Sequence, residues 1–219
     1  ACGRSAATRA GERGIGMSAW PLAPLVEQRY RAIVIDPPWK FSAGTKGRPQ
    51  HYQRMTDAEF AALPLARLAQ PEGAFFFLWI TSPIDGPRFW QNIYPGWKRQ
   101  GLRYSARAFV WAKTHRVGAN GGDALFVHRD SFFIGQGFTT RKNVEDCLLF
   151  RIGAPKRQRR DVRELILSPL REHSRKPDEA FDRVISFCAG PYAEGFARES
   201  REGWETFGDE STKFDGESA

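Results

Sequence analysis

Long apolar segments, paired cysteines and metal-ligand spacings are all missing from this 219-residue sequence. The longest apolar run, residues 74–80, is strand-sized and far shorter than the roughly 20 residues of a membrane-spanning helix. Three scattered cysteines exclude a disulfide framework and a CxxC zinc site, and the four histidines show no paired ligand spacing. The N-terminus also lacks the apolar core of a secretion signal. These absences predict a cytoplasmic, metal-free protein in which Cys147 and Cys188 pack as small apolar side chains.

The chain does contain enough apolar residues to fold, together with an excess of positive charge. Hydrophobic residues make up 41% and aromatic residues 13% of the sequence, which indicates a globular protein. Residues 1–16 lack periodicity and are predicted to be a disordered leader, with Met17 as an alternative start. Residues 17–210 are predicted to form one domain, and residues 211–219 a flexible tail. The net charge of +8 favours polyanionic partners such as nucleic acid, although many basic proteins bind none.

Strand-like and helix-like patterns alternate along the predicted domain. Short apolar runs predict strands over residues 31–36, 74–80, 106–113, 146–152, 161–167 and 194–199. Helical spacing predicts helices over residues 57–69 with a bend at Pro64, 83–101 with an interruption at Pro95-Gly96, and 177–188. This alternation predicts an α/β fold with a mostly parallel sheet and helices on both faces. Because ligands of such sheets lie beyond the carboxyl ends of the strands, residues 36–39 and 197–200 are expected at the ligand edge.

The segment Asp36-Pro37-Pro38-Trp39 carries groups that suit chemistry on an exocyclic amine. The exocyclic nitrogen of adenine is a poor nucleophile, because its lone pair is delocalised into the ring. The Asp36 carboxylate and the Pro37 carbonyl can accept hydrogen bonds from both amine hydrogens, which localises that lone pair. Trp39 offers a flat face to a base that has left the duplex stack. Taken alone, the motif is also explained by a turn that places Trp39 in the core.

The sequence resembles the permuted DPPW family of adenine N6-methyltransferases, which includes the catalytic subunit of the eukaryotic mRNA adenosine methyltransferase and small bacterial and phage members. The resemblance extends from about residue 30 to residue 210. It rests on six segments in the family's order: YRAIVIDPPW (30–39), AFFFLWITS (74–82), FVWAKTH (109–115), GQGFTTRKNVEDCLLF (135–150), HSRKPDE (173–179) and GPYAEGFARESREGWETFGDE (190–210). It implies a circularly permuted, Rossmann-like fold that binds S-adenosylmethionine, with the catalytic strand early and the cofactor strand near the C-terminus. The absence of a glycine-rich loop after an early strand agrees with that order.

The resemblance also implies roles for individual residues. Lys176 would contact the carboxylate of the cofactor, just before a helix N-terminus that itself favours anions. The other implied cofactor-binding residues are Phe196, Arg198, Glu199, Asp209 and Glu210. A loop beside the target base would contribute Arg141, Asn143 and Glu145. This sequence departs from the family at two positions, because Glu199 stands where many relatives have a second arginine and Lys142 separates Arg141 from Asn143.

A basic run follows this loop and is the candidate surface for phosphate contacts. Residues 151–175 contain three acidic and eight basic residues. The basic residues are Arg151, Lys156, Arg157, Arg159, Arg160, Arg163, Arg171 and Arg175. The expected phosphate contacts are Lys156, Arg157, Arg159 and Arg160, with Lys40 beside the flipped nucleotide. A solvated basic loop is the alternative explanation.

Together these features predict an S-adenosylmethionine-dependent methyltransferase acting on the N6 amine of adenine in nucleic acid. The resemblance to bacterial and phage members favours DNA, since those members lack large RNA-binding extensions. RNA is the alternative polymer, and the N4 amine of cytosine is the alternative acceptor. A non-catalytic nucleic-acid-binding or scaffold protein is disfavoured, because all four DPPW residues are present. Family members include free-standing enzymes and heterodimers, so a homodimer or heterodimer with a related subunit is left open.

Overall fold

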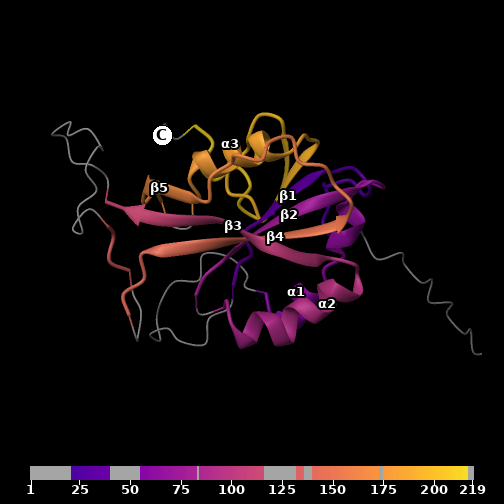
Figure 1. The fold of residues 1–219 in the computed structure, drawn as a ribbon, viewed down its shortest axis with the longest axis horizontal. Coiled ribbons are helices and arrows are strands. Elements are labelled where there is room, and N and C mark those ends of the chain that lie inside the picture. Colours follow the sequence, from indigo (N-terminus) through magenta and orange to yellow (C-terminus); the bar gives the residue numbers. More distant parts are fainter. Residues whose placement is uncertain are drawn as a thin grey trace, which may run out of the picture.

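The fold has three layers, a central sheet and a layer of helices on each of its faces (Figure 1). The structure is a computed structural model, and it describes residues 21–39, 55–82, 84–115, 132–135, 140–172 and 175–216. The predicted leader, residues 1–16, and Lys40 lie outside the described residues. The α/β class and the flanked sheet expected from the sequence are both confirmed.

The described strands form one sheet in the order β5-β3-β4-β2-β1-β6-β7. Their bounds are β1 Ala32–Ile35, β2 Gly73–Ile80, β3 Arg103–Thr114, β4 Val144–Gly153, β5 Leu165–Pro169, β6 Tyr192–Gly195 and β7 Trp204–Phe207. The pairs β1–β2, β1–β6, β6–β7 and β3–β5 are parallel, whereas β4 runs antiparallel to both β2 and β3. The sheet is therefore mostly parallel, as predicted.

The helices divide between the two faces of the sheet (Figure 1). One face carries α1 (Asp57–Ala62), a 3₁₀ turn (Leu65–Leu68), a π-helical segment (Arg88–Ile93) and α2 (Tyr94–Arg99), and the other carries α3 (Asp178–Phe187). A capping box between Thr56 and Glu59 begins α1, and Pro64 separates that helix from the 3₁₀ turn, at the predicted bend. The predicted interruption near Pro95-Gly96 corresponds to a change of helix type, because the π-helical segment ends at Ile93 and α2 begins at Tyr94, with Pro95 in its first turn.

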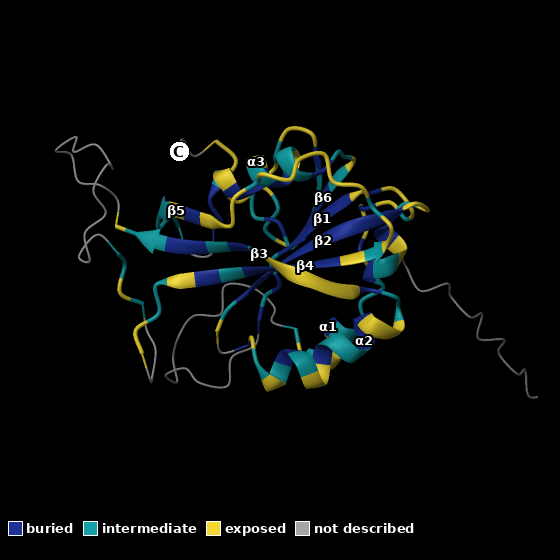
Figure 2. Cartoon of the chain, viewed as in Figure 1, coloured by how far each residue is buried: buried dark blue, intermediate teal, exposed yellow. Residues whose placement is uncertain are grey.

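Alternating side chains of the central strands fill a separate core on each face. In β1, Ile33 and Ile35 pack on the α1 and α2 side, whereas Ala32 and Val34 pack on the α3 side. All four are buried, which explains why a short β-branched run without alternation reads as a central strand. Figure 2 shows the buried central strands and, in contrast, an exposed first half of β3.

Two predicted strands have different bounds in the structure. The run 161–167 begins pairing only at Leu165 and continues to Pro169. The run 194–199 is displaced, because β6 ends at Gly195 and Phe196 then adopts a left-handed backbone conformation with φ of +64°. The strand β7 was not predicted, since its four residues WETF alternate only briefly.

The segment 211–216 belongs to the packed domain, although the sequence placed it in a flexible tail. Phe214 is buried, and its ring lies 5.3 Å from the guanidinium of Arg175. Asp215 accepts hydrogen bonds at 2.7 Å from both the backbone N–H and the hydroxyl of Ser200. A single buried aromatic residue in a polar segment was too weak a signal to predict this packing.

The described residues also bear on membranes and metals. None of their helices combines the length and apolarity that crossing a bilayer requires. Within the same residues, no group of three or more histidine, cysteine, aspartate or glutamate side chains is arranged to hold a metal ion.

Candidate active site

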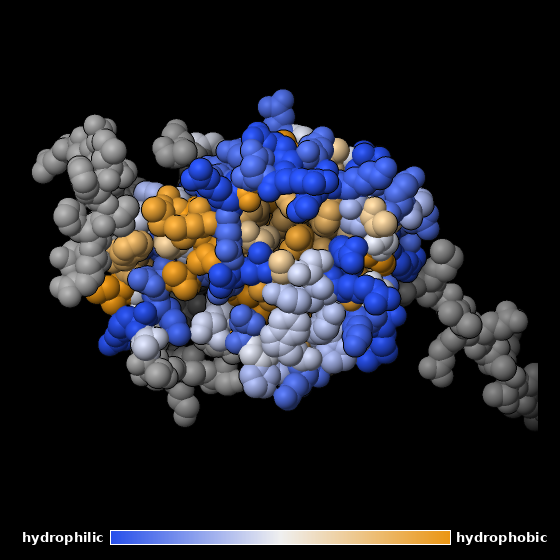
Figure 3. Space-filling view, viewed as in Figure 1, coloured by the Kyte–Doolittle hydropathy of each residue, from blue (hydrophilic) through white to orange (hydrophobic). Residues whose placement is uncertain are grey.

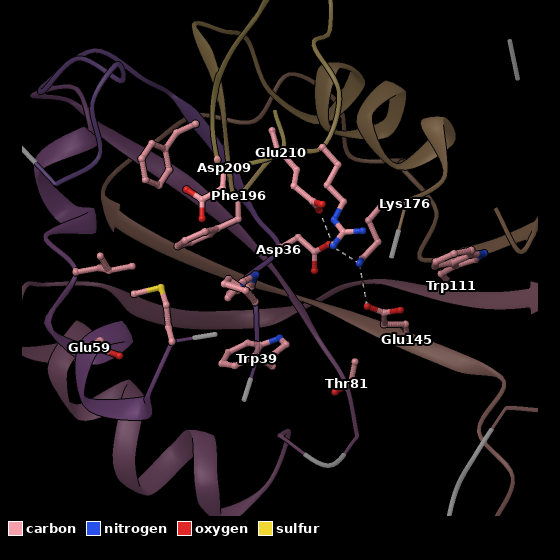
Figure 4. A pocket seen from close by; sticks show the side chains of 18 of the residues that line it. Asp36, Trp39, Glu59, Thr81, Trp111, Glu145, Lys176, Phe196, Asp209 and Glu210 are labelled. Carbon is pink, nitrogen blue, oxygen red and sulfur yellow. Dashed lines mark hydrogen bonds and ion pairs between the residues drawn. The ribbon is translucent and has the colours of Figure 1, made fainter. Parts of the chain in front are cut away.

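The candidate active site lies where several strands end at one edge of the sheet. β1 and β6 are parallel neighbours, yet the chain continues from β1 to β2 on one side and from β6 to β7 on the other. Ligands of α/β sheets bind in the crevice at such a switch point. A cavity of about 1020 Å³ opens there, which is large enough for a cofactor-sized ligand. Figure 4 shows polar side chains converging on it from both sides.

This one cavity collects most of the residues predicted from separate parts of the sequence. The catalytic motif contributes Asp36, Pro37, Pro38 and Trp39. The C-terminal segments contribute Lys176, Phe196, Arg198, Asp209 and Glu210. Asp36 and Lys176 are 140 positions apart in the chain, and they meet because Lys176 precedes α3, which leads into β6 beside β1. The candidate catalytic residues and most of the candidate cofactor-binding residues therefore line the same cavity.

Lys176 lies at the centre of a buried network of charges. Its Nζ is 2.6 Å from Asp36 Oδ2 and 3.1 Å from Glu145 Oε1 (Figure 4). Glu145 Oε2 accepts a further hydrogen bond from Lys113 Nζ at 2.7 Å. Two ammonium groups therefore alternate with two carboxylates in the cavity wall.

The network shifts the pKa values of its members in different directions. Burial would lower the pKa of Lys176, but Asp36 and Glu145 raise it overall, so the ammonium stays charged. Burial would raise the pKa of Glu145, but Lys176 and Lys113 lower it overall. Asp36 shares only one of these ammonium groups, and burial raises its pKa above the ordinary value. The network therefore favours the ionised form of Glu145, whereas the net effect at Asp36 favours its protonated form.

Backbone hydrogen bonds hold the Asp-Pro-Pro-Trp segment at the end of β1. Asp36 N donates to the carbonyl of Gly195 in β6 at 3.3 Å, and Trp39 N donates to Pro37 O at 2.8 Å. A carbonyl oxygen has two lone pairs, so Pro37 O retains the capacity to accept a second hydrogen bond. The acceptor role predicted for Pro37 is compatible with this geometry.

Trp39 is mainly a core residue. Its side chain is buried and meets Phe60 edge-on, with the ring centroids 5.1 Å apart. The indole also lines the cavity, and its Nε1 has no hydrogen-bond partner among the described residues. Most of the Trp39 ring therefore packs in the core, as the alternative explanation of the motif expects. A smaller part of the ring lines the cavity.

A close crossing of two loops shapes the wall after β6 and β7. Phe196 turns the chain toward the cavity, and Ala197 N donates to the carbonyl of the last residue of β7 at 2.8 Å. A Cβ on Gly208 would lie 2.8 Å from Ala197 O, so glycine permits this approach. Arg198 and Glu210 form an ion pair of 3.1 Å across the same wall.

Glu199 and two arginines of the basic run form ion pairs within the fold. Glu199 does not line the main cavity, and it accepts from Arg175 at 2.6 Å and from Arg201 at 2.7 Å. Arg175 is only 6% exposed, and Arg171 pairs with Asp178 at 2.7 Å. These arginines hold the segment before α3 in place and are not part of a solvated basic surface.

Only one residue of the predicted target-base loop lines the cavity. Glu145 is the second residue of β4, which starts at the cavity edge because it runs antiparallel to β2. Arg141 is exposed and does not line the cavity. Asn143 contributes its carbonyl to Lys113 N at 2.8 Å, and its side chain is likewise not part of the lining.

Three polar residues near the cavity were not singled out from the sequence. Lys113 and Thr81 stand at or after the ends of β3 and β2, so the rule that placed Asp36 at the ligand edge would also have indicated them. Glu194 is buried within β6, beside Asp36 and Lys176 in a small adjoining hollow. An acid inside an otherwise apolar strand was the available signal for Glu194.

The predicted phosphate-binding residues Lys156, Arg157, Arg159 and Arg160 are exposed but lie far from this cavity. They follow β4, whose last residue Gly153 pairs with Gly73 at the start of β2. The loop then contacts the C-terminal end of α3, where Gln158 N donates to Phe187 O at 2.7 Å. The antiparallel direction of β4 thus carries the basic run to the opposite edge of the sheet.

A mostly parallel sheet flanked by helices, with polar residues from several strand ends meeting at the switch point, defines an α/β protein with the methyltransferase fold. The sequence profile of the MT-A70 family matches residues 30–210, and the chain belongs to that family. The chain is 29% identical over 210 residues to the human N(6)-adenine-specific methyltransferase METTL4, over 88% of this chain and 40% of the relative. The chain therefore spans less than half the length of that relative.

Proposed function

We propose that this protein transfers the methyl group of S-adenosylmethionine to the N6 amine of adenine in nucleic acid, with DNA as the preferred polymer. The observation that carries the proposal is the meeting of Asp36 with Lys176 and the Phe196–Arg198 segment in one cavity. Membership of the MT-A70 family and similarity to a human N(6)-adenine-specific methyltransferase support the same reaction.

The groups on the β6 and β7 side fit the chemistry of S-adenosylmethionine. Its carboxylate needs a cation, and Lys176 and Arg198 both line this wall. Its ribose hydroxyls need acceptors, and Asp209 and Glu210 supply carboxylates. The ring of Phe196 offers an apolar surface for the adenine of the cofactor. When bound, the cofactor supplies an electrophilic methyl group on a sulfonium.

Asp36 and Pro37 orient the target amine in this scheme. Lys176 holds Asp36 through Oδ2, and Oδ1 has no hydrogen-bond partner among the described residues. Oδ1 accepts one amine hydrogen and Pro37 O accepts the other, which turns the lone pair of the nitrogen toward the methyl group. Lys176 favours the ionised form of Asp36 against the larger effect of burial, and an uncharged Asp36 would be a weaker acceptor.

The Asp36→Asn variant tests the proposal. We expect methyl transfer from labelled S-adenosylmethionine to an adenine-containing oligonucleotide to fall at least about 100-fold, since positioned acceptors commonly contribute this much. Calorimetry should show cofactor binding retained in Asp36→Asn and weakened in Lys176→Met. The matched control is Asp182→Asn, which removes an exposed carboxylate of α3.

Three outcomes would overturn parts of the proposal. Full activity of Asp36→Asn would remove the orienting role of the carboxylate. Absence of cofactor binding, with and without nucleic acid, would assign the chain to a non-catalytic nucleic-acid-binding role. Mass spectrometry of the product nucleosides separates N6-methyladenine from N4-methylcytosine, and parallel reactions on duplex DNA, single-stranded DNA and RNA rank the polymers.

A further inference from the structure

A second cavity of about 450 Å³ lies on the α3 face, toward the edge of the sheet opposite the candidate active site. We call it the phenylalanine cleft. Its apolar lining consists of Phe75, Phe77, Phe109, Leu149, Val162 and Phe187. Its volume falls within the range of sites that hold small aromatic ligands. Figure 3, in which the α3 layer lies at the top, shows apolar surface near the middle of the view with hydrophilic residues above it.

The cleft exists because α3 is too short to cover the whole face. The ten residues of α3 pack over the centre of the sheet, and Phe187 at the end of the helix closes one side of the cleft. The first five residues of β3 are exposed, and β5 pairs only with the later part of that strand, from Val110 onward. The loop between β4 and β5 is the remaining cover, held to α3 through Gln158.

The aromatic rings in the cleft contact one another, and one of them is partly exposed. Phe77 stacks on Phe109 with the ring planes 7° apart, and Phe187 meets Phe75 edge-on at 5.0 Å. Phe75, Phe77 and Phe109 are buried, whereas Phe187 is only partly buried. Phe187 is therefore the ring best placed to meet a planar ligand.

The rim of the cleft carries positive charge that the fold leaves uncompensated. Arg151 and Arg157 both line the cavity, and neither has an ion-pair partner among the described residues. Arg107 also lines it, but Glu164 and Asp146 balance that charge. Lys156 and Arg160 of the same loop are exposed as well. An anionic ligand with an aromatic ring matches this combination of rim and lining.

We propose that the phenylalanine cleft binds an unstacked base of a single nucleic-acid strand, with the flanking phosphates on Arg151 and Arg157. Cations beside aromatic rings are the chemistry by which proteins hold single strands. Arg151 and the active-site residue Glu145 lie six positions apart on β4, a separation of about 20 Å at 3.4 Å per residue. The inference rests on the proposed function in taking nucleic acid as the substrate, and it makes the cleft an anchor remote from the target base.

Fluorescence anisotropy with a labelled 12-nucleotide DNA strand, without cofactor, tests the anchor. The double variant Arg151→Glu/Arg157→Glu should weaken binding at least about tenfold, because two phosphate contacts are reversed in sign. The matched control Lys98→Glu/Arg99→Glu makes the same charge change on exposed residues of α2, on the other face, and should bind within about threefold of the parent protein. Equal weakening by both double variants would overturn the proposal.

Filling the cleft separates base insertion from a simple phosphate patch. Val162→Trp keeps the rim charges and should weaken binding about 5- to 150-fold, which is the range for one stacked base. An abasic strand should bind the parent protein more weakly than the base-containing strand does. The same abasic strand should bind Val162→Trp and the parent protein with equal affinity. Unchanged binding by a folded Val162→Trp, checked by its thermal unfolding, would leave a phosphate patch only and overturn the proposal. An acidic tyrosine-containing peptide that displaces the strand more effectively than unlabelled DNA would assign the cleft to a protein partner and also overturn it.

The cleft and the proposed reaction fail in different ways. Methyl transfer by Asp36→Asn tests the reaction, whereas strand binding by the cleft variants in this assay tests the cleft. A protein that binds through the cleft but methylates no polymer would refute the reaction and leave the cleft intact. A protein that methylates adenine while all cleft variants bind normally would refute the cleft alone.

Discussion

Glu194 in β6 is a buried carboxyl group whose protonation makes the stability of the fold depend on pH. Its side chain is 7% exposed, and its Oε2 has no hydrogen-bond partner among the described residues. Burial, supported by the charges of Asp36 and Glu199, outweighs the opposing effect of Arg201 and raises the pKa of Glu194 from 4.5 to about 8. The folded protein therefore holds this proton at neutral pH, whereas the unfolded chain releases it.

The sign and size of the effect follow from that difference. Between pH 4.5 and about 8 the folded state binds the extra proton, so the free energy of unfolding decreases as the pH rises. The decrease is about 1.4 kcal/mol per pH unit within this window. Over the whole window it reaches at most about 5 kcal/mol, a large part of the stability of a typical domain. Above pH 8 the contribution of Glu194 to the slope disappears.

The Glu194→Gln variant isolates this contribution, because its amide has nearly the same shape and does not titrate. Urea unfolding of both proteins at intervals from pH 5 to pH 8.5 gives the difference in free energy of unfolding. We expect the free energy of unfolding of the variant to increase relative to that of the parent protein as the pH rises. This difference should become constant above pH 8. The shifts of Asp36 and Glu145 affect both proteins and largely cancel in the difference.

An exposed carboxylate provides the control for this experiment. Glu202→Gln lies in the turn before β7, and its stability difference from the parent protein should stay constant over the same pH range. A difference between Glu194→Gln and the parent that is equally flat would refute the reasoning. It would mean that Glu194 is ionised in the folded protein and has found a compensating partner.

Other predictions follow from individual contacts. The raised pKa of Asp36 means that methyl transfer should be lost, as the pH falls, at a higher pH than for an ordinary aspartate, which a pH–rate profile measures. Thr56→Ala removes the capping box of α1 and should cost about 1 kcal/mol in urea unfolding, with no change in the slope against denaturant. Gly96→Ala should lower the thermal midpoint, because its Cβ would lie 2.4 Å from a carbonyl oxygen of α1. Burial raises the pKa of Cys188 to about 12 and that of Cys147 as well, so peptide mapping after thiol labelling should find both unmodified in the native protein and modified in urea.

The local elements that the sequence predicted well are those with a strong apolar pattern. The continuous runs at 31–36 and 74–80 correspond to β1 and β2, and the stripe at 177–188 corresponds to α3. The brief strand β7 and the packing of Phe214 were missed, since short polar segments carry little periodicity. The interruption expected at Pro95 takes the form of a boundary between the π-helical segment and α2, and the sequence did not predict the π-helical geometry.

What the sequence by itself determined is the class of fold and the position of Asp36 at the end of a central strand, since both depend on local pattern. Only the tertiary structure decided which distant residues meet. The contact of Lys176 with Asp36 and Glu145 requires the pairing of β1 with β6 and the antiparallel start of β4. That same antiparallel direction places the basic run away from the active site. Arg151 and Arg157 of this run line the phenylalanine cleft. Strand direction and strand order arise from packing across the whole sheet, so no local pattern in the chain encodes them.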